Sequence, residues 1–303
     1  MSGPLLMLAL GGNALAPADR RADVEDQRRR LAVVSTALAG VTIERPVVIT
    51  HGNGPQVGQL ALDQLAAHRE MLDPLDVLDA ATEGSLGYLV EVAVRNALQP
   101  RPVVSVLTLV EVDPNDPAFA DPTKPVGPAY PRRDAMLLAG RWGWTVHQTE
   151  RGWRRVVPSP EPRRVIEHDA IAALVAQGLV VVCAGGGGIP VVRENGGWRG
   201  VEAVIDKDLT TALLATRLHA GSLVLLTDVP GVIVEGFGTP HARSVAHLTV
   251  PQARALALPA GAMGTKIEAA CRFVEATGRD ARIGALDDAA EVIAGRAGTR
   301  INR

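Results

Sequence analysis

Short, continuous apolar runs alternate along the chain with longer segments whose apolar positions recur at helical spacing. Six of the runs have the length and composition of strands. Apart from the sixth, which contains Arg282, they are continuous rather than alternating, as is typical of parallel strands buried on both faces. The predicted strands are Leu5–Leu10, Pro46–Thr50, Val103–Leu107, Leu179–Cys183, Leu223–Thr227 and Ala281–Leu286.

The segments between these runs predict helices. They are Val24–Leu38, Gln56–His68, Leu86–Leu98, Glu167–Ala176, Leu209–His219 and Met263–Thr277. A glycine follows four of them, where a left-handed C-terminal cap is expected: Gly40, Gly178, Gly221 and Gly278. Strand and helix alternating in this way predict an α/β fold, with helices on both sides of a mostly parallel sheet.

The segment from Asp113 to about Pro162 interrupts this alternation and is rich in proline and tryptophan. A segment of this length inside a compact domain is usually functional, so it predicts a small inserted subdomain or lid. The alternative is a disordered linker. Trp142, Trp144 and Trp153 disfavour a linker, because large aromatic side chains need something to pack against.

Composition excludes several classes of protein. The chain has 303 residues, is 47% hydrophobic and carries a formal net charge of −2, without the basic excess of a nucleic-acid-binding protein. Its two cysteines, Cys183 and Cys271, lie far apart in apolar sequence and indicate neither a disulfide framework nor a zinc site. The N-terminal apolar run is too short for a membrane span. The simplest compartment is a reducing cytoplasm.

Four glycine-rich segments each follow a predicted strand, and ligands of parallel sheets bind at the carboxyl ends of strands. Glycine lets the backbone approach an anion closely and turn its N–H groups toward it. None of the segments matches the dinucleotide fingerprint, and the chain has no Gly-Lys pair for a P-loop. The segments begin at Gly11, His51, Gly185 and Asp228.

Lysine is rare, with three lysines among 31 basic residues. Lys207 lies between two aspartates at the start of a predicted helix, where it opposes the helix dipole and is placed to meet an anion. Lys266 lies at another glycine-rich helix start, and Lys124 lies in the inserted segment. Since lysine is a compact point charge that arginine does not replace at a phosphoryl group, all three are candidate phosphate-binding residues.

Seven blocks in one order carry a family resemblance over essentially the whole chain. They are LGGNA (10–14), HGNGPQVG (51–58), TKPVGP (123–128), GWRRVVPSP (152–160), CAGGGGIPVV (183–192), GVEAVIDKD (200–208) and KIEAA (266–270). The chain resembles the carbamate kinases, a branch of the amino acid kinases. Like them, it has no lysine on the first strand. Where the family commonly has Gly-Ser-Met-Gly-Pro-Lys, this chain has Gly-Ala-Met-Gly-Thr-Lys at 261–266.

The resemblance implies a single amino acid kinase domain over residues 1–303, a three-layer αβα sandwich with a mostly parallel central sheet. Its N-terminal part, about 1–215, would bind carbamate, and its C-terminal part, about 216–303, would bind the nucleotide. A small subdomain, about 113–162, would protrude from it.

The resemblance also assigns site residues. It implies that Lys207 and Lys266 contact the transferring phosphate, that Asp208 organises them and that Lys124 reaches the site from the subdomain, and it implies no metal ligand. The expected substrate-binding residues are Gly11, Gly12, Asn13, Gly52, Asn53, Gly54, Gly186 and Gly187. The expected nucleotide-binding residues are Thr227, Asp228, Val229, Met263, Gly264 and Lys266.

The implied reaction is reversible phosphoryl transfer between ATP and carbamate, giving ADP and carbamoyl phosphate with Mg²⁺ as cofactor. Such an enzyme would make ATP during arginine catabolism, as a cytoplasmic homodimer with small-molecule partners and neither a nucleic acid nor a membrane. Carbamate is already an anion, so the reaction needs no general base. His51 is therefore expected to be structural, while Glu202 and Asp206 are open between helix capping and metal contact.

Two other functions are compatible with these motifs. The chain could phosphorylate another small acid, such as an acylated amino acid, although the missing first-strand lysine disfavours this. It could also be a silent nucleotide-binding or storage protein on the same scaffold, because a fold does not fix a function. The presence of all three lysines disfavours that alternative.

Overall fold

The structure is a computed structural model and describes residues 3–15, 23–41, 45–67, 73–149, 152–235, 243–258 and 262–303. Its strands are β1 (Leu6–Leu10), β2 (Val47–His51), β3 (Val103–Ser105), β4 (Leu109–Glu111), β5 (Lys124–Tyr130), β6 (Thr145–Thr149), β7 (Gly152–Val157), β8 (Arg164–Val165), β9 (Val180–Val182), β10 (Ile189–Glu194), β11 (Gly197–Gly200), β12 (Ser222–Thr227), β13 (Ile233–Glu235), β14 (Arg243–Ser244), β15 (His247–Thr249), β16 (Ala281–Ala285) and β17 (Thr299–Asn302).

The α-helices are α1 (Gly12–Leu15), α2 (Val24–Val41), α3 (Gly54–Ala66), α4 (Leu75–Ala97), α5 (Arg132–Trp142), α6 (His168–Ala176), α7 (Lys207–Arg217), α8 (Val250–Ala255), α9 (Ala262–Thr277) and α10 (Ala289–Ile293). Short 3₁₀ turns lie at η1 (Pro117–Phe119) and η2 (Gly185–Gly187). In the described ranges, no helix is both long enough and apolar enough to cross a membrane.

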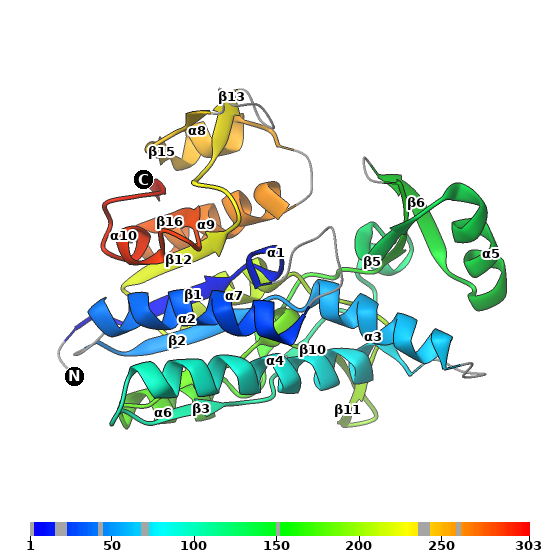
Figure 1. Ribbon diagram of the computed structural model, residues 1–303, viewed down its shortest axis with the longest axis horizontal. Coiled ribbons are helices and arrows are strands. Elements are labelled where there is room, and N and C mark those ends of the chain that lie inside the picture. The colour runs from blue at the N-terminus through cyan, green and yellow to red at the C-terminus, as the bar shows by residue number, and fades with distance from the viewer. Residues whose placement is uncertain are drawn as a thin grey trace.

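Among the described residues, the largest sheet has eight strands in the order β15-β17-β16-β12-β1-β2-β9-β3 (Figure 1). The strands from β16 to β3 all pair in parallel, whereas β17 pairs antiparallel with β16. Each of the six predicted strands lies in this parallel part, so the prediction of a mostly parallel sheet is confirmed. The flanking strands β15 and β17 were not predicted, because they are short and not uniformly apolar.

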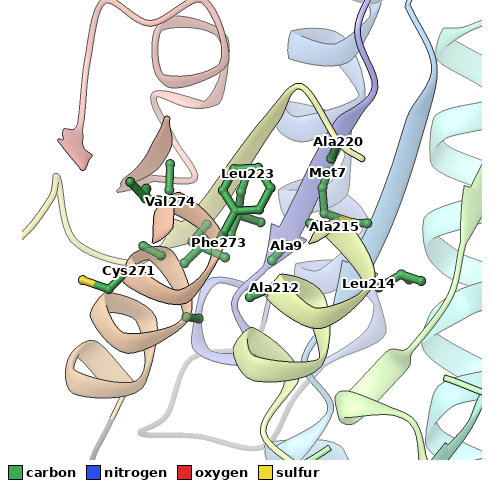
Figure 2. Packing of buried hydrophobic residues seen from close by; sticks show 14 of the residues in the cluster. Met7, Ala9, Ala212, Leu214, Ala215, Ala220, Leu223, Cys271, Phe273 and Val274 are labelled. Carbon is green, nitrogen blue, oxygen red and sulfur yellow. The ribbon is translucent and has the colours of Figure 1, made fainter. Parts of the chain in front are cut away.

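Alternate residues of the central strands pack into two separate cores, one on each face of the sheet. Met7 and Ala9 of β1 face α7 and α9, where Phe273 is fully buried (Figure 2). Leu6 and Leu8 face α2, α4 and α10 on the other side. Every residue of β1 is therefore buried, which explains its unbroken apolar run and confirms the three-layer αβα architecture.

Three sequence predictions about helix ends were wrong. Helix α4 begins at Leu75, eleven residues before the predicted start at Leu86. Gly178 and Gly278 have positive φ as predicted, but Gly40 lies inside α2, and near Gly221 the residue with positive φ is His219. The predicted helix 56–68 matches α3, although His68 itself lies outside the described residues.

The inserted segment (residues 113–162) folds into structure that protrudes from the central layers (Figure 1). Its strands form an antiparallel sheet in the order β5-β7-β6, joined to α5. Arginines stack on its tryptophans: Arg155 lies 4.8 Å from the centroid of the Trp144 ring, and Arg132 lies 5.8 Å from that of Trp153. The described part of this segment thus consists of a helix and a three-stranded sheet with stacked arginine and tryptophan side chains.

The inserted segment meets the rest of the chain where two backbones touch. A Cβ atom on Gly58 of α3 would lie 2.1 Å from the Cα of Gly127 in β5, so a side chain is excluded there. Gly127 has a φ of +69°, which also favours glycine. Around this contact, Val57 and Leu75 pack against Val126 in a small apolar core. The two glycines therefore set how closely the inserted segment approaches α3.

The substitution Gly58→Ala should lower the free energy of unfolding by about 1–3 kcal/mol, because the new methyl group meets backbone atoms that must move. Gly140→Ala in α5 is the matched control, since nothing lies within 4 Å of its new Cβ. The control should be neutral or more stable by up to about 1 kcal/mol. Urea unfolding followed by tryptophan fluorescence measures both, and equal stability of the two variants would contradict this account of the contact.

Candidate active site

The four predicted glycine-rich segments lie side by side at one edge of the sheet. They follow β12, β1, β2 and β9, which are adjacent in that order and parallel, so their carboxyl ends meet. The hydrogen-bond ladder continues into the segments, where Gly11 N–H donates to the Leu226 carbonyl and Gly52 N–H donates to the Leu10 carbonyl, both at 2.9 Å. The strand order thus brings together backbone segments that are far apart in sequence.

Gly52 lies at the closest approach of three of these elements. A Cβ atom there would lie 2.7 Å from the amide nitrogen of Gly12 and 3.3 Å from Cδ of Lys207. Only a residue without a side chain allows the lysine stem to lie against both backbones. The structure therefore brings together Gly12, Gly52 and Lys207. Asn13 lies in α1, and its side chain is outside the described part of the chain.

The centre of the site is a buried carboxylate between two lysines. The Asp208 carboxylate accepts from Lys207 through one oxygen and from Lys266 through the other, the latter at 3.1 Å. The three side chains are 4%, 9% and 6% exposed, in the order Asp208, Lys207 and Lys266. Two lysines flank one carboxylate, so these three side chains together carry a net positive charge at the edge where the glycine segments meet.

The pKa values follow from this arrangement. Burial raises the pKa of Asp208, but the charges of Lys207 and Lys266 outweigh burial and lower it to about 2. Burial lowers the pKa of Lys266, but Asp208 outweighs this effect and raises it. Burial lowers the pKa of Lys207, with help from the charge of Lys266 and against the attraction of Asp208. Asp208 is therefore an anion at neutral pH, and its charge holds the two lysines together.

Lys124 reaches this centre from the first residue of β5. Its Nζ donates to the Ile205 carbonyl at 3.0 Å and to Oδ2 of Asp206 at 3.4 Å. The other oxygen of Asp206 accepts from the Asp208 N–H at 2.9 Å and caps α7. Asp206, which the sequence left open between capping and metal contact, thus both caps α7 and pairs with Lys124.

Glu202, the other ambiguous carboxylate, contacts the start of α4. One of its oxygens accepts from the Leu75 N–H at 3.0 Å, and the other lies 4.0 Å from Nη2 of Arg155. These contacts link the first turn of α4 to the inserted segment. They are a helix-capping contact and an ion-pair contact.

The segment from Ala184 to Gly188 has an unusual backbone. Ala184, Gly186, Gly187 and Gly188 all have positive φ. Polar side chains hold this shape: Glu83 accepts from the Gly185 N–H at 2.9 Å, and Thr210 donates to the Gly187 carbonyl at 2.8 Å. Gly187 also lies against the Ile205 carbonyl that Lys124 contacts, because a Cβ there would be 2.7 Å from that oxygen.

Asn53 and Gly54 mark the start of α3, and the Asn53 side chain lies against Gly186. It donates to Asp79 and Thr82 of α4 rather than capping its own helix. His51, in the preceding strand, is fully buried, and neither ring nitrogen has a hydrogen-bond partner among the described residues. Burial lowers the pKa of His51 to about 4, with the charge of Lys207 adding to the effect. A neutral, enclosed imidazole fits the expected structural role.

The expected nucleotide-binding residues lie at the adjoining ends of β12 and α9. Thr227 ends β12 and donates to the exposed Asp228 at 3.1 Å, and the charge of Asp228 adds a smaller effect to that of Asp208 in raising the pKa of Lys266. Val229 follows directly, and Met263 and Gly264 lie in the first turn of α9. The structure thus places Asp228 near Lys266. Gly261, the first residue of the sequence block 261–266, lies outside the described residues.

The sequence did not identify Asp79, Thr82, Glu83, Thr108 and Thr210, the polar residues that hold these segments. Thr108 accepts from the Ala184 N–H at 2.9 Å, and its own N–H donates to Glu83 at 3.3 Å. Asp79 and Glu83 lie one turn apart on the buried face of α4. A sequence signal was available, because Leu75, Leu78 and Leu86 recur at helical spacing. Extending the predicted helix from Leu86 back to Leu75 places Asp79 and Glu83 on the same face as these leucines.

Within the described ranges, no group of three or more His, Cys, Asp and Glu side chains could hold a metal ion. A shallow groove of about 650 Å³ lies between α2 and α10 and contains none of the three lysines. The glycine segments and the lysines, rather than that groove, therefore define the candidate site. Its backbone donors, buried positive charge and capped helix start are suited to binding phosphoryl oxygens.

Comparison with known proteins agrees with this geometry. Residues 4–285 match the amino acid kinase family. The chain is 46% identical over 301 residues to a carbamate kinase of Rhizobium meliloti (strain 1021), covering 98% of this chain and 93% of that protein. The structure superposes on carbamate kinase from Giardia lamblia bound to citric acid with a TM-score of 0.90 at 38% identity, covering 99% of both chains. It superposes on the same enzyme bound to AMP-PNP with a TM-score of 0.87.

These matches identify the protein family and then the branch of that family. The chain belongs to the amino acid kinase family and, within it, to the carbamate kinases. The predicted family and fold are thereby confirmed.

The substitution Asp208→Asn should lower the free energy of unfolding by about 3–5 kcal/mol at neutral pH, because it removes the buried negative charge that both lysines contact. The pKa of Asp208 is depressed in the folded protein, so its stabilising effect is complete above the unfolded pKa of about 3.9 and is lost as the pH falls toward about 2. The difference between wild type and variant should therefore shrink over that interval.

Urea unfolding at pH values from 7 down to 3 measures this difference, with Asp121→Asn as the control for removing an exposed carboxylate. The control should match the wild type throughout. A difference for Asp208→Asn that stays constant down to pH 3 would contradict the assignment of Asp208 as the shared counter-ion.

Proposed function

We propose that this chain catalyses reversible phosphoryl transfer between ATP and carbamate, giving ADP and carbamoyl phosphate. The observation that carries the proposal is the Lys207–Asp208–Lys266 centre, buried where four glycine-rich segments meet. Membership of the carbamate kinases supplies the acceptor. The rival acceptors and the silent scaffold both become less plausible, since the near full-length relatives named above are carbamate kinases.

In the proposed reaction, a carboxylate oxygen of carbamate attacks the γ-phosphorus of ATP. A new P–O bond forms while the bond to the β,γ-bridging oxygen breaks, and its electron pair remains on ADP. No proton is transferred, which agrees with His51 being neutral and enclosed. The protein's contribution is to align the two anions and to offset the charge of the moving phosphoryl group.

Each part of the site has a role in this scheme. The N–H groups of Gly12, Asn53, Gly54 and Gly186 would face carbamate and the transferring phosphoryl group, while Gly11, Gly52 and Gly187, whose N–H groups donate to backbone carbonyls, would let the backbone approach them closely. Lys207 and Lys266 would neutralise phosphoryl oxygens, with Asp208 fixing the distance between them. Lys124 would add a third positive charge from the inserted segment, next to Asp206. Thr227, Asp228, Val229, Met263 and Gly264 would line the nucleotide side.

Mg²⁺ fits this site as an ion carried by the nucleotide. Both oxygens of Asp208 are engaged by lysines, and Asp206 is engaged by its cap and by Lys124. The exposed carboxylate of Asp228 would be the protein group that holds the ion, beside the β- and γ-phosphates and water. When bound, the ion would neutralise charge between those two phosphates.

The two parts of the chain would have separate binding roles. The N-terminal part, about 1–215, would bind carbamate, and the C-terminal part, about 216–303, would bind the nucleotide. The inserted segment would close over the site.

Both cysteines are unpaired and buried, which fits a reducing cytoplasm. Consumption of carbamoyl phosphate to make ATP is the direction expected in arginine catabolism.

A homodimer is proposed through the outer face of α4. Val77, Tyr88 and Val92 are 48%, 59% and 40% exposed along this helix, and Leu107, 54% exposed, lies beside Gly84 of the same face. A row of exposed large apolar side chains on one helix is typical of an interaction surface. A second copy of the chain would cover it by the same face, as in most two-fold symmetric dimers.

The purified protein should make ATP from ADP and carbamoyl phosphate, and Lys207→Ala should lower kcat by about 10²–10³ because a preorganised charge is lost. Arg217→Ala, at the exposed end of the same helix, is the matched control and should keep the wild-type rate. A coupled luciferase assay measures ATP formation. Absence of ATP from the wild type would sink the proposed function, and a normal rate for Lys207→Ala would remove that residue from the mechanism.

The substitution Tyr88→Glu should convert the dimer into a monomer, because it buries a charge in an apolar contact. Leu137→Glu is the matched control, since Leu137 is 63% exposed but lies on α5. Sedimentation velocity distinguishes the two masses. A wild-type protein that sediments as a monomer would refute the proposed dimer, and a dimeric Tyr88→Glu would place its interface elsewhere.

A further inference from the structure

Asn53 occupies the capping position of α3, yet its side chain makes no capping hydrogen bond. Its amide nitrogen Nδ2 donates instead to Oδ1 of Asp79 at 3.1 Å and to Oγ1 of Thr82 at 2.9 Å, both on α4. The Asn53 side chain is 1% exposed, and Asp79 and Thr82 are buried as well. An asparagine suited to capping is thus held in another direction by a different helix.

These two contacts fix which way the Asn53 amide faces. Thr82 uses its own hydroxyl hydrogen on the Leu78 carbonyl at 2.8 Å, so its oxygen is an acceptor toward Asn53. Oδ1 of Asp79 accepts the other hydrogen of the same amide group. Reversing the amide would turn the Asn53 oxygen toward the Thr82 oxygen, whose single hydrogen is already donated to the Leu78 carbonyl. The Asn53 oxygen Oδ1 therefore faces away from α4.

The Asn53 amide lies on Gly186. It fills the space that a side chain would take at that residue, since a Cβ there would be 2.4 Å from Oδ1 of Asn53. The N–H groups of Gly185, Gly187 and Gly188 donate to Glu83, Ala184 and Gly185 respectively. Among the described residues, neither the Gly186 N–H nor Oδ1 of Asn53 has a hydrogen-bond partner. A fixed donor and a fixed acceptor thus lie beside one another.

Lys124 lies in the same neighbourhood. Burial raises the pKa of Asp79 to about 8, against the opposing effects of its hydrogen bond from Asn53 and of the nearby charge of Lys124. Gly187, next to Gly186, contacts the Ile205 carbonyl to which Lys124 donates. The free donor and acceptor therefore lie within the candidate active site and not in a separate cavity.

We propose that Oδ1 of Asn53 accepts a hydrogen bond from the amino group of carbamate while the Gly186 N–H donates to one of its oxygens, with Asp79 and Thr82 as positioning residues that make the site select an acyl group bearing N–H. This inference rests on the proposed function and adds the source of its selectivity. Carbamoyl and acetyl groups have nearly the same size and differ in an amino group against a methyl group.

A methyl group cannot donate a hydrogen bond, so an acetyl substrate that fills the same position would leave Oδ1 of Asn53 without the partner that the amino group supplies. Sites built to bind a substrate N–H reject analogues that lack it, and a single uncompensated buried acceptor corresponds to about 10–10²-fold. The selectivity depends on the orientation of Asn53. Freeing that amide should therefore reduce the preference for carbamoyl phosphate over acetyl phosphate.

The experiment compares Thr82→Val with Thr82→Ser. Valine keeps the shape of threonine but removes the acceptor, whereas serine keeps the hydroxyl group. With saturating ADP, kcat/KM is measured for carbamoyl phosphate and for acetyl phosphate, together with the KM for ADP and the Tm. Thr82→Val should lose about tenfold in kcat/KM for carbamoyl phosphate and less than threefold for acetyl phosphate, with an unchanged KM for ADP. Thr82→Ser should restore the wild-type ratio.

Thr82→Ala serves as a second variant if Thr82→Val fails to fold. It also removes the hydroxyl oxygen that accepts from Asn53, so it should reduce the ratio as well. A parallel loss for both acyl phosphates, or an unchanged ratio in both variants, overturns the inference. If acetyl phosphate gives no measurable turnover with any form, the carbamoyl-phosphate loss and its rescue by serine decide the outcome. A wild-type protein that makes no ATP from carbamoyl phosphate defeats the proposed function itself, which is a separate result.

Discussion

The arrangement of the site depends on the attraction between Asp208 and its two lysines. Placing Lys207 and Lys266 a few ångströms apart in a buried region is unfavourable unless an anion lies between them. Asp208 supplies that anion and comes from the first turn of α7, whose start is capped by Asp206. Because Asp206 also pairs with Lys124, the same turn fixes the position of the inserted segment's lysine. One helix start thus sets the geometry of all three cations.

The second constraint is the absence of side chains where backbones meet. Gly52 allows contact with Gly12 and Lys207, and Gly58 allows contact with Gly127 of the inserted segment. These glycines are needed for close approach and not only for turning the chain. A lysine in an open cleft would be hydrated and its charge screened, whereas here the stem of Lys207 is enclosed by backbone and its charge acts at short range.

The parts that the sequence predicts well are those with a single physical cause. Strands buried on both faces must be apolar throughout, so Leu5–Leu10 and Leu223–Thr227 are recognisable without any structure. The lysines stand out because arginine fills most basic positions in this chain. The start of α4 was missed because Asp79, Thr82 and Glu83 replace apolar residues on its buried face and break the helical period. Those residues are polar because they bind Asn53 and the Gly185 N–H, contacts that only the fold creates.

Helix α4 therefore has two kinds of surface with different requirements. Its buried face places a hydroxyl group and two carboxyl groups against Asn53 and the segment 184–188, where small displacements change which hydrogen bonds are possible. Its outer face carries Val77, Tyr88 and Val92, which we propose to be covered by a second copy of the chain. A rigid helix packed on both sides keeps its register better than one open to solvent. The proposed dimer would thus hold in place the residues that orient Asn53. The apolar outer face of α4 would then serve the active site by way of the dimer contact.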